Sequence, residues 1–277
     1  MAGIVGVAKA PLQFRDSTMR ANPLREIWSK GGAVLNGWIA IPHPFSVEVM
    51  AHQGWDSLTV DMQHGVAGYE ATLNSLIAIS TTPTVPLVRV PWLEPSILMK
   101  ALDAGAYGVI CPMVNTVADA ELLVQATTYP PRGGRSFGPI RALYYGGADY
   151  PKQADDTVVR FAMIETRAGL DNVREIARVD GLDAIYIGPA DLSSALGCTP
   201  KFDQDEKLVV DAIDHILGET RAAGKIAGIH NGTSSYARGM IEKGFRFVTV
   251  ASDARLMAAG AKAVVTELAG ARGGRAA

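Results

Sequence analysis

The amino-acid sequence predicts a (β/α)₈ barrel, the TIM-barrel fold of the α/β class. The length of 277 residues suits one α/β barrel domain. Eight short apolar runs recur along the chain, and most are continuously apolar, as is typical of parallel strands buried on both faces. Helical patterns lie between the runs, which indicates repeated βα units. A doubly wound open sheet is the alternative, but the GxGxxG motif that would favour it does not follow the first run.

The strands predicted by these apolar runs follow one another along the whole chain. In order, they cover residues 33–41, 57–62, 84–90, 108–114, 160–166, 184–189, 226–230 and 247–252. We therefore expect a barrel domain over 22–268, an N-terminal extension over 1–21 and a flexible tail over 269–277.

Helices are predicted before the first strand and between the strands. The patterns cover residues 22–30, 44–54, 95–106, 116–127, 169–179, 207–224 and 234–244. Several of them stop at glycine, the usual end of a helix. Two longer connections, 129–156 and 194–206, are expected to be lids, substrate loops or subunit contacts.

Composition and charge exclude several classes of partner. With 26 basic and 28 acidic residues, the chain has a net charge of −2 and lacks the basic stretch of a nucleic-acid-binding protein. No apolar run reaches the ~18 residues of a membrane span. The two cysteines, Cys111 and Cys198, form no disulfide or zinc pattern. We expect a cytoplasmic protein; the alternative is an organelle-targeting segment that uses Lys9, Arg15 and Arg20.

Two carboxylates follow neighbouring strands of the predicted barrel. Strand ends meet at one rim, where a barrel builds its active site. Glu165 and Asp191 lie about one βα unit apart, so their side chains are expected to converge there. Two carboxylates with water are typical ligands of Mg²⁺ or Mn²⁺. The alternative is a pair of buried acids neutralised by Arg167 or Arg89.

Other polar residues at this rim are candidates for proton transfer and charge stabilisation. His64 could move protons near neutral pH, although a structural histidine is the alternative. Arg89 ends an apolar strand and must be paired or functional, because an unpaired buried charge is costly; an ion pair with Asp61 is the simpler explanation. Asp103, on the following helix, could orient a histidine or lie on a solvated face.

The segment Gly188-Pro189-Ala190-Asp191 brings small residues to a predicted helix start. Free backbone N–H groups at a helix N-terminus bind anions such as a carboxylate. The alternative is an ordinary turn capped by Asp191 or Ser193.

These residues lie in motifs that are specific in combination. His64 lies in GWDSLTVDMQHG, Arg89 in PLVRVPW, and both Glu165 and Asp191 in ETRAGLDNVREIARVDGLDAIYIGPADLSSALG. With NPLREIWSKGG, LDAGAYGVICPMVNT, YPPRGGRSFG and GFRFVTVASDA, the chain resembles the HpcH/HpaI aldolase family over about residues 22–268. The resemblance implies a TIM barrel and a class II, metal-dependent pyruvate aldolase. Sugar-acid aldolases and macrophomate synthase belong to the same family.

The resemblance assigns a role to each candidate. Glu165 and Asp191 would hold a divalent metal ion, Mg²⁺, Mn²⁺ or Co²⁺, and Arg89 would contact the keto oxygen of pyruvate. His64 would be the acid/base residue, and Asp103 would raise its basicity across a subunit contact.

The resemblance also implies a substrate and an assembly. Backbone around Gly188, Pro189, Ala190 and Asp191 would hold the pyruvate carboxylate. The substrates would be small molecules, a 2-oxo acid and an aldehyde. The protein would be a homo-oligomer, a hexamer with a C-terminal helix exchanged between neighbours.

Two positions depart from the family pattern. Gln63 stands where the family has Glu, and Met163 stands where it often has Gln two residues before the metal ligand. The first change removes a charge beside His64, and the second leaves the geometry of the pyruvate end open. No lysine ends a core strand, which argues against a Schiff-base aldolase.

The aldehyde end is expected to be partly apolar. Its candidate lining residues are Phe45, Trp92, Leu93, Tyr144, Tyr145, His230 and the 129–156 segment. Trp38 and Trp92 favour an apolar acceptor, whereas Arg135 and Arg141 could serve a phosphorylated aldehyde.

Other reactions of the same metal–enolate type are the alternatives. They are oxaloacetate decarboxylation, acyl-CoA cleavage of the citrate-lyase branch and macrophomate-synthase-like bond formation. A barrel that binds a 2-oxo acid without catalysis is a further alternative.

Overall fold

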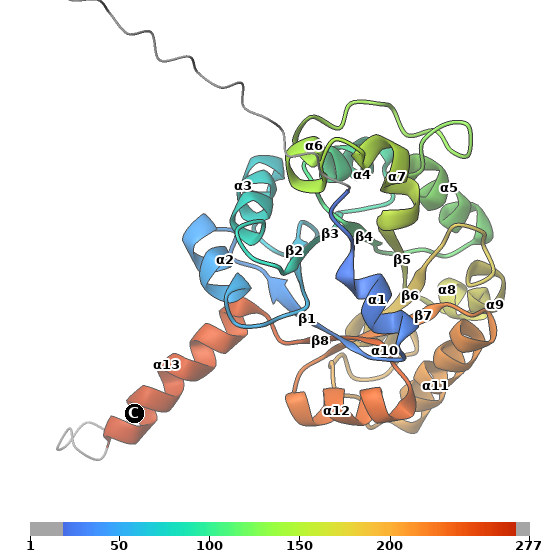
Figure 1. Cartoon of the computed structure of the whole chain (residues 1–277). Helices are drawn as coiled ribbons and strands as arrows, with labels where there is room; N and C mark the ends of the chain where they lie inside the picture. Colours follow the sequence, from blue (N-terminus) through green and yellow to red (C-terminus); the bar gives the residue numbers. More distant parts are fainter. Residues whose placement is uncertain (1–18, 270–277) are drawn as a thin grey trace, which may run out of the picture.

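Eight parallel strands close into a barrel in the order β1 to β8, with helices around it (Figure 1). The protein is represented by a computed structural model that describes residues 19–269. The predicted (β/α)₈ barrel is confirmed. The predicted extension and tail lie outside the described residues, except for 19–21 and 269. Within residues 19–269, no helix combines the length and apolar character needed to cross a membrane.

Each strand begins within one residue of its predicted start. The strands are β1 (Val34–Ile39), β2 (Ser57–Asp61), β3 (Val85–Arg89), β4 (Gly108–Cys111), β5 (Val159–Ile164), β6 (Ala184–Ile187), β7 (Ile226–Asn231) and β8 (Phe247–Val250). Most strands are buried along their whole length because one face meets the helices and the other fills the barrel.

Helices cover the outside of the barrel. They are α1 (Pro23–Ser29), α2 (Pro44–Ala51), α3 (Tyr69–Ile79), α4 (Pro95–Asp103), α5 (Val117–Thr127), α6 (Ile140–Gly146), α7 (Tyr150–Thr157), α8 (Arg167–Asp171), α9 (Val173–Ile176), α10 (Pro189–Ala195), α11 (Lys207–Ala222), α12 (Ser234–Lys243) and α13 (Asp253–Ala269). The helix predicted over 169–179 is split into α8 and α9 at Asn172, which is the C-cap of the first and the N-cap of the second.

Polar groups inside the barrel satisfy one another. Asn36 donates from its side-chain amide to Thr249 at 2.9 Å and accepts from the hydroxyls of Ser57 and Thr59. All four residues are fully buried. The network therefore joins strands β1, β2 and β8 without leaving these side chains unpaired.

The predicted 129–156 connection is not a plain loop, because it contains helices α6 and α7. Two arginines hold it to the barrel, Arg135, which is fully buried, and Arg141, which is half-buried. Arg135 pairs with Asp103 at 2.7 Å and lies 4.4 Å from the ring centre of Tyr129. Arg141 donates to the backbone oxygen atoms of Ala104 and Leu76. The expectation that these arginines serve a phosphorylated aldehyde is therefore wrong.

The last helix, α13, projects away from the barrel (Figure 1). Only its first residues are buried or half-buried, and Asp253 anchors it. The Asp253 carboxylate accepts hydrogen bonds from the backbone N–H groups of Ala40 at 2.8 Å and Ile41 at 3.1 Å. The start of α13 is therefore fixed against the segment that follows β1.

The Arg135→Ala substitution should destabilise the protein by about 3 kcal/mol, because it leaves Asp103 without its partner and opens space at a fully buried position. Arg132→Ala is the matched control. Arg132 is 62% exposed and pairs with Asp155 and Asp156 at the surface, so its loss should leave stability unchanged. Urea unfolding would measure both, and equal midpoints for the two variants would contradict a structural role for Arg135.

Candidate active site

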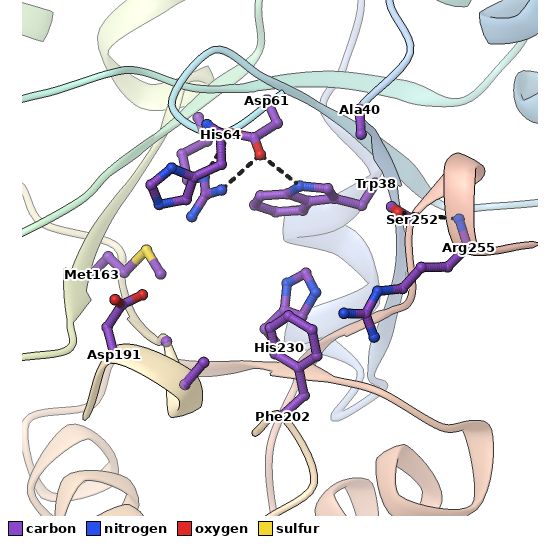
Figure 2. Close-up of a pocket in the computed structure, with 13 residues that line it drawn as sticks. Trp38, Ala40, Asp61, His64, Met163, Asp191, Phe202, His230, Ser252 and Arg255 are labelled. Carbon is purple, nitrogen blue, oxygen red and sulfur yellow. Dashed lines mark hydrogen bonds and ion pairs between the residues drawn. The ribbon is translucent and has the colours of Figure 1, made fainter. Parts of the chain in front are cut away.

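A pocket of about 400 Å³ opens where the strands end (Figure 2). Its lining residues are Trp38, Ala40, Asp61, His64, Arg89, Met163, Gly188, Ala190, Asp191, Phe202, His230, Ser252 and Arg255. The structure thus brings the predicted residues His64, Arg89, Gly188, Ala190 and Asp191 into one cavity.

The floor of the pocket is built on a buried ion pair between neighbouring strands. Asp61 and Arg89 occupy partner positions on β2 and β3. The Arg89 guanidinium donates to both carboxylate oxygens, from Nε at 2.8 Å and from Nη2 at 2.6 Å. Trp38 donates its indole N–H to the same carboxylate at 3.1 Å. The ion pair with Asp61 that the sequence offered as the simpler explanation for Arg89 is therefore present.

The ion pair keeps Asp61 charged and leaves one amino group of Arg89 free. Burial alone would raise the pKa of Asp61, but hydrogen bonds and the charge of Arg89 lower it below its ordinary value. Within residues 19–269, Nη1 of Arg89 makes no hydrogen bond. Arg89 lines the pocket as well, so this amino group is available to a ligand.

The same carboxylate shapes the turn that carries His64. Asp61 Oδ1 accepts from the backbone N–H groups of Gln63 at 3.1 Å and His64 at 3.3 Å. The turn places the exposed His64 side chain at the pocket (Figure 2). Gln63, where the family pattern has Glu, keeps its amide oxygen buried without a hydrogen-bond partner.

Glu165 presents a free carboxylate oxygen beside Asp191. One oxygen, Oε1, accepts from the backbone N–H of Met113 at 2.8 Å, while Oε2 is buried without a partner. Met113 has a φ of 56°, a conformation that L-residues rarely adopt. In this conformation its backbone N–H donates to Glu165. A side chain at Gly188 would come within 2.6 Å of Oε2, so glycine keeps this space open.

This carboxylate pair fits a divalent cation. Burial, and to a lesser degree the charge of Asp191, raise the pKa of Glu165 from 4.5 to about 7. A buried oxygen without a partner next to a second carboxylate is a site that a hard cation would stabilise. No third His, Cys, Asp or Glu of the described chain completes a metal-binding group with them, so water or substrate oxygens would supply the other ligands.

The start of α10 forms the adjacent wall. Gly188 is the N-cap of this helix, and no side chain caps it. Ser193 instead donates to the backbone oxygen of Ala190, so the capped turn offered as the alternative is absent. The N–H groups of Ala190 and Asp191 have no hydrogen-bond acceptor within residues 19–269. They could bind a carboxylate from the ligand.

Asp103 lies apart from this pocket in the single chain. It ends α4 and pairs with Arg135, and burial raises its pKa although Arg135 acts in the opposite direction. The structure does not bring Asp103 to His64 within one chain. Its role across a subunit contact stays a prediction.

The aldehyde end differs from the prediction. Of the residues expected to line it, His230 reaches the pocket, together with Trp38, whereas Tyr145 packs 4.7 Å from Tyr107 in the core. Phe45, Trp92, Leu93 and Tyr144 do not line it. The sequence analysis did not name Phe202 or Arg255. Arg255 could have been found, because it follows the end of the last strand by less than two helical turns.

His230 is a neutral group in the middle of this wall. Burial first, and then the charges of Arg89 and Arg255, lower its pKa to about 3. Its ring lies 5.0 Å from Trp38 and 4.6 Å from Phe202, and its Nδ1 is hydrogen-bonded to the hydroxyl of Tyr186 at 3.1 Å.

Comparison with known proteins agrees with this architecture. A family model described as HpcH/HpaI aldolase/citrate lyase matches residues 36–259. The chain is 44% identical over 246 residues to a protein of Rhizorhabdus wittichii named hydroxypyruvate/pyruvate aldolase, a match that covers 89% of this chain and 98% of the relative.

Two further proteins are similar over nearly the same length. A 4-hydroxy-2-oxo-heptane-1,7-dioate aldolase of Salmonella dublin is 35% identical, with 88% of this chain and 93% of the relative covered. The crystal structure of an HpcH/HpaI aldolase/citrate lyase family protein from Burkholderia cenocepacia superposes with a TM-score of 0.84 at 30% identity. That match covers 89% of this chain and 99% of the other.

Mn²⁺ should bind at this pocket through Glu165 and Asp191. Glu165→Gln and Asp191→Asn should each weaken binding at least tenfold, whereas the exposed Asp180→Asn should not change it. Because the metal binds the ionised carboxylate, affinity should rise with pH until the pH exceeds about 7, the pKa of Glu165. Titration calorimetry from pH 5.5 to 8 would measure this. Equal affinity in wild type and Glu165→Gln would exclude the site.

Glu165 should also make the metal-free protein less stable as pH rises. Its folded pKa of about 7 lies above the ordinary 4.5, so the folded state holds a proton that the unfolded state has lost. Relative to Glu165→Gln, the wild type should lose up to about 3 kcal/mol of stability between pH 4.5 and 8. Urea unfolding with EDTA would test this, and parallel pH profiles of the two proteins would contradict it.

Proposed function

The chain belongs to the HpcH/HpaI aldolase/citrate lyase family and is an aldolase, a carbon–carbon lyase, and we propose that it reversibly cleaves a 4-hydroxy-2-oxo acid to pyruvate and an aldehyde with a divalent metal ion. The observation that carries the proposal is the buried Oε2 of Glu165, which has no hydrogen-bond partner and lies next to Gly188, behind the pocket lined by Asp191, His64 and Arg89. The name of the R. wittichii relative further suggests hydroxypyruvate as a second donor.

Glu165 and Asp191 would hold the metal ion, which we propose to be Mg²⁺, Mn²⁺ or Co²⁺. When bound, such an ion supplies a Lewis acid that stabilises negative charge on a keto oxygen. The free N–H groups of Ala190 and Asp191, at the start of the helix that Gly188 and Pro189 open, would bind the carboxylate of the 2-oxo acid.

Arg89 would stabilise the charge that develops during cleavage. When the bond between C3 and C4 breaks, its electron pair moves into the pyruvate fragment and the keto oxygen becomes negative. Asp61 already holds the guanidinium in place, so its free amino group would meet this charge without reorganisation.

His64 would move the protons. It would take the proton of the 4-hydroxyl group as the aldehyde forms and deliver a proton to C3 of the pyruvate fragment. Asp103 would raise the basicity of His64 only from a neighbouring copy, because in its own chain it pairs with Arg135. This arrangement requires a homo-oligomer. The hexamer and the cytoplasmic location stay predictions of the sequence.

Decarboxylation and acyl-CoA cleavage would use the same core, and the products separate these reactions. The aldolase is favoured because the R. wittichii and S. dublin relatives, which match nearly the whole chain, are both named aldolases.

The wild type should consume pyruvate or hydroxypyruvate with a small aldehyde in the presence of Mg²⁺, Mn²⁺ or Co²⁺, and EDTA should abolish the reaction. His64→Ala should lower kcat about 10²–10⁴-fold, and Arg89→Ala should lower kcat about 10²–10³-fold. Exposed residues give matched controls, and His215→Ala and Arg178→Ala should retain full activity.

Chromatography of the products would decide between the reactions. A hydroxylated 2-oxo acid that forms only with metal supports the aldolase. Carbon dioxide from oxaloacetate without any aldol product, or full activity of His64→Ala, would overturn the proposed mechanism.

A further inference from the structure

The pocket has a second cationic group at the end opposite to the carboxylate pair. Figure 2 shows Asp191 and Arg255 on opposite sides, with Trp38 and His230 between them. Arg255 lies in the first turn of α13, whose start is fixed by the bonds of Asp253 to the segment after β1. The guanidinium is therefore carried into the pocket by an anchored part of the chain.

The charge of Arg255 is not neutralised within the described chain. The other arginine of the pocket, Arg89, is paired with Asp61, but no carboxylate of residues 19–269 forms an ion pair with Arg255. Its guanidinium carbon lies 4.7 Å from the ring centre of Phe202. Stacking on an aromatic ring orients a guanidinium and leaves its N–H groups free to bind an anion in two parallel hydrogen bonds.

The groups around Arg255 offer no competing anion. His230 is neutral, and the side chain of Ser252 lines the pocket at the same end. The carboxylates next in sequence to Phe202 are engaged elsewhere. Asp203 accepts from the backbone N–H of Gly232 and from a threonine hydroxyl, and Asp205 pairs with Lys201.

We propose that Arg255, stacked on Phe202, is a specificity-determining residue that binds an anionic group, a carboxylate or a phosphate, at the end of the aldehyde distal to its carbonyl. The proposal rests on the proposed function and names its acceptor class. The 2-oxo acid end of the substrate lies at Glu165 and Asp191, and the acceptor extends along Trp38 and His230 to Arg255. The protein therefore prefers an acceptor with an acidic far end to a neutral one of similar length.

The acceptor preference of each variant tests this assignment. It is expressed as the ratio of kcat/KM for an anionic aldehyde to kcat/KM for a neutral one. With pyruvate and Mn²⁺, we would measure kcat/KM for succinic semialdehyde against butanal, and for glyceraldehyde 3-phosphate against glyceraldehyde. In Arg255→Ala, the ratio that favours the anionic aldehyde should fall tenfold to a hundredfold, the range for a lost hydrogen bond to a charged group. Arg255→Lys should keep part of the preference, because it retains the charge without the planar fork.

Two more variants separate recognition from indirect effects. Phe202→Leu removes the ring that orients the guanidinium and should lower the same ratio without a change in net charge. Lys262→Ala removes a positive charge from the exposed part of α13 and should leave the ratio unchanged. Thermal midpoints and Mn²⁺ affinities would show that each variant is folded with its metal site intact.

The outcomes are distinct. A fall in only one of the two ratios supports the assignment and identifies the anion as carboxylate or phosphate. Unchanged ratios in Arg255→Ala, or an equal fall in Lys262→Ala, would overturn the assignment and leave the proposed function standing. Failure of the wild type to consume pyruvate with any of the four aldehydes would overturn the proposed function and this subsite with it.

Discussion

The ion pair between Asp61 and Arg89 is the interaction on which the rest of the site depends. Two opposite charges occupy partner positions on neighbouring barrel strands, and each is almost inaccessible to water. Such charges persist in a protein interior only when they are paired with each other and hydrogen-bonded. Asp61 also accepts from Trp38 and from the turn that carries His64. One carboxylate thus sets the position of a cation, an aromatic wall and a histidine.

The fold was largely predictable because the buried strands of a barrel leave a strong apolar signal. The apolar pattern does not predict helices that are short and rich in Gly, Pro or Tyr, such as α6 and α7. Arg135 and Arg141, which the sequence offered for a phosphorylated aldehyde, are instead engaged by distant segments. Arg135 is fully buried and pairs with Asp103, and Arg141 is half-buried and donates to the backbone oxygen of Ala104. Local pattern carries no information about such long-range partners.

The polar end of the site was predictable for a topological reason. Every strand of a barrel delivers its C-terminal residue to the same rim, so sequence position alone brings His64, Arg89, Glu165 and Asp191 together. The aromatic end was predictable only in part. His230 and Trp38 were named, but the position of Phe202 depends on which way its ring points from a long loop. Asp103 shows a second limit, since one chain alone does not bring it to the histidine it was expected to assist.

The two ends of the pocket come from different stretches of the chain, and this has an evolutionary consequence. The ion pair, the histidine and both carboxylates lie between Asp61 and Asp191, whereas Phe202, His230 and Arg255 all lie after residue 200. Inheritance of a new segment beyond residue 200, by recombination or by accumulated change, would replace the acceptor wall and leave the bond-breaking groups intact. Trp38 is the exception, because it contacts Asp61 at one end and His230 at the other. A substitution of Trp38 would therefore affect both ends of the pocket.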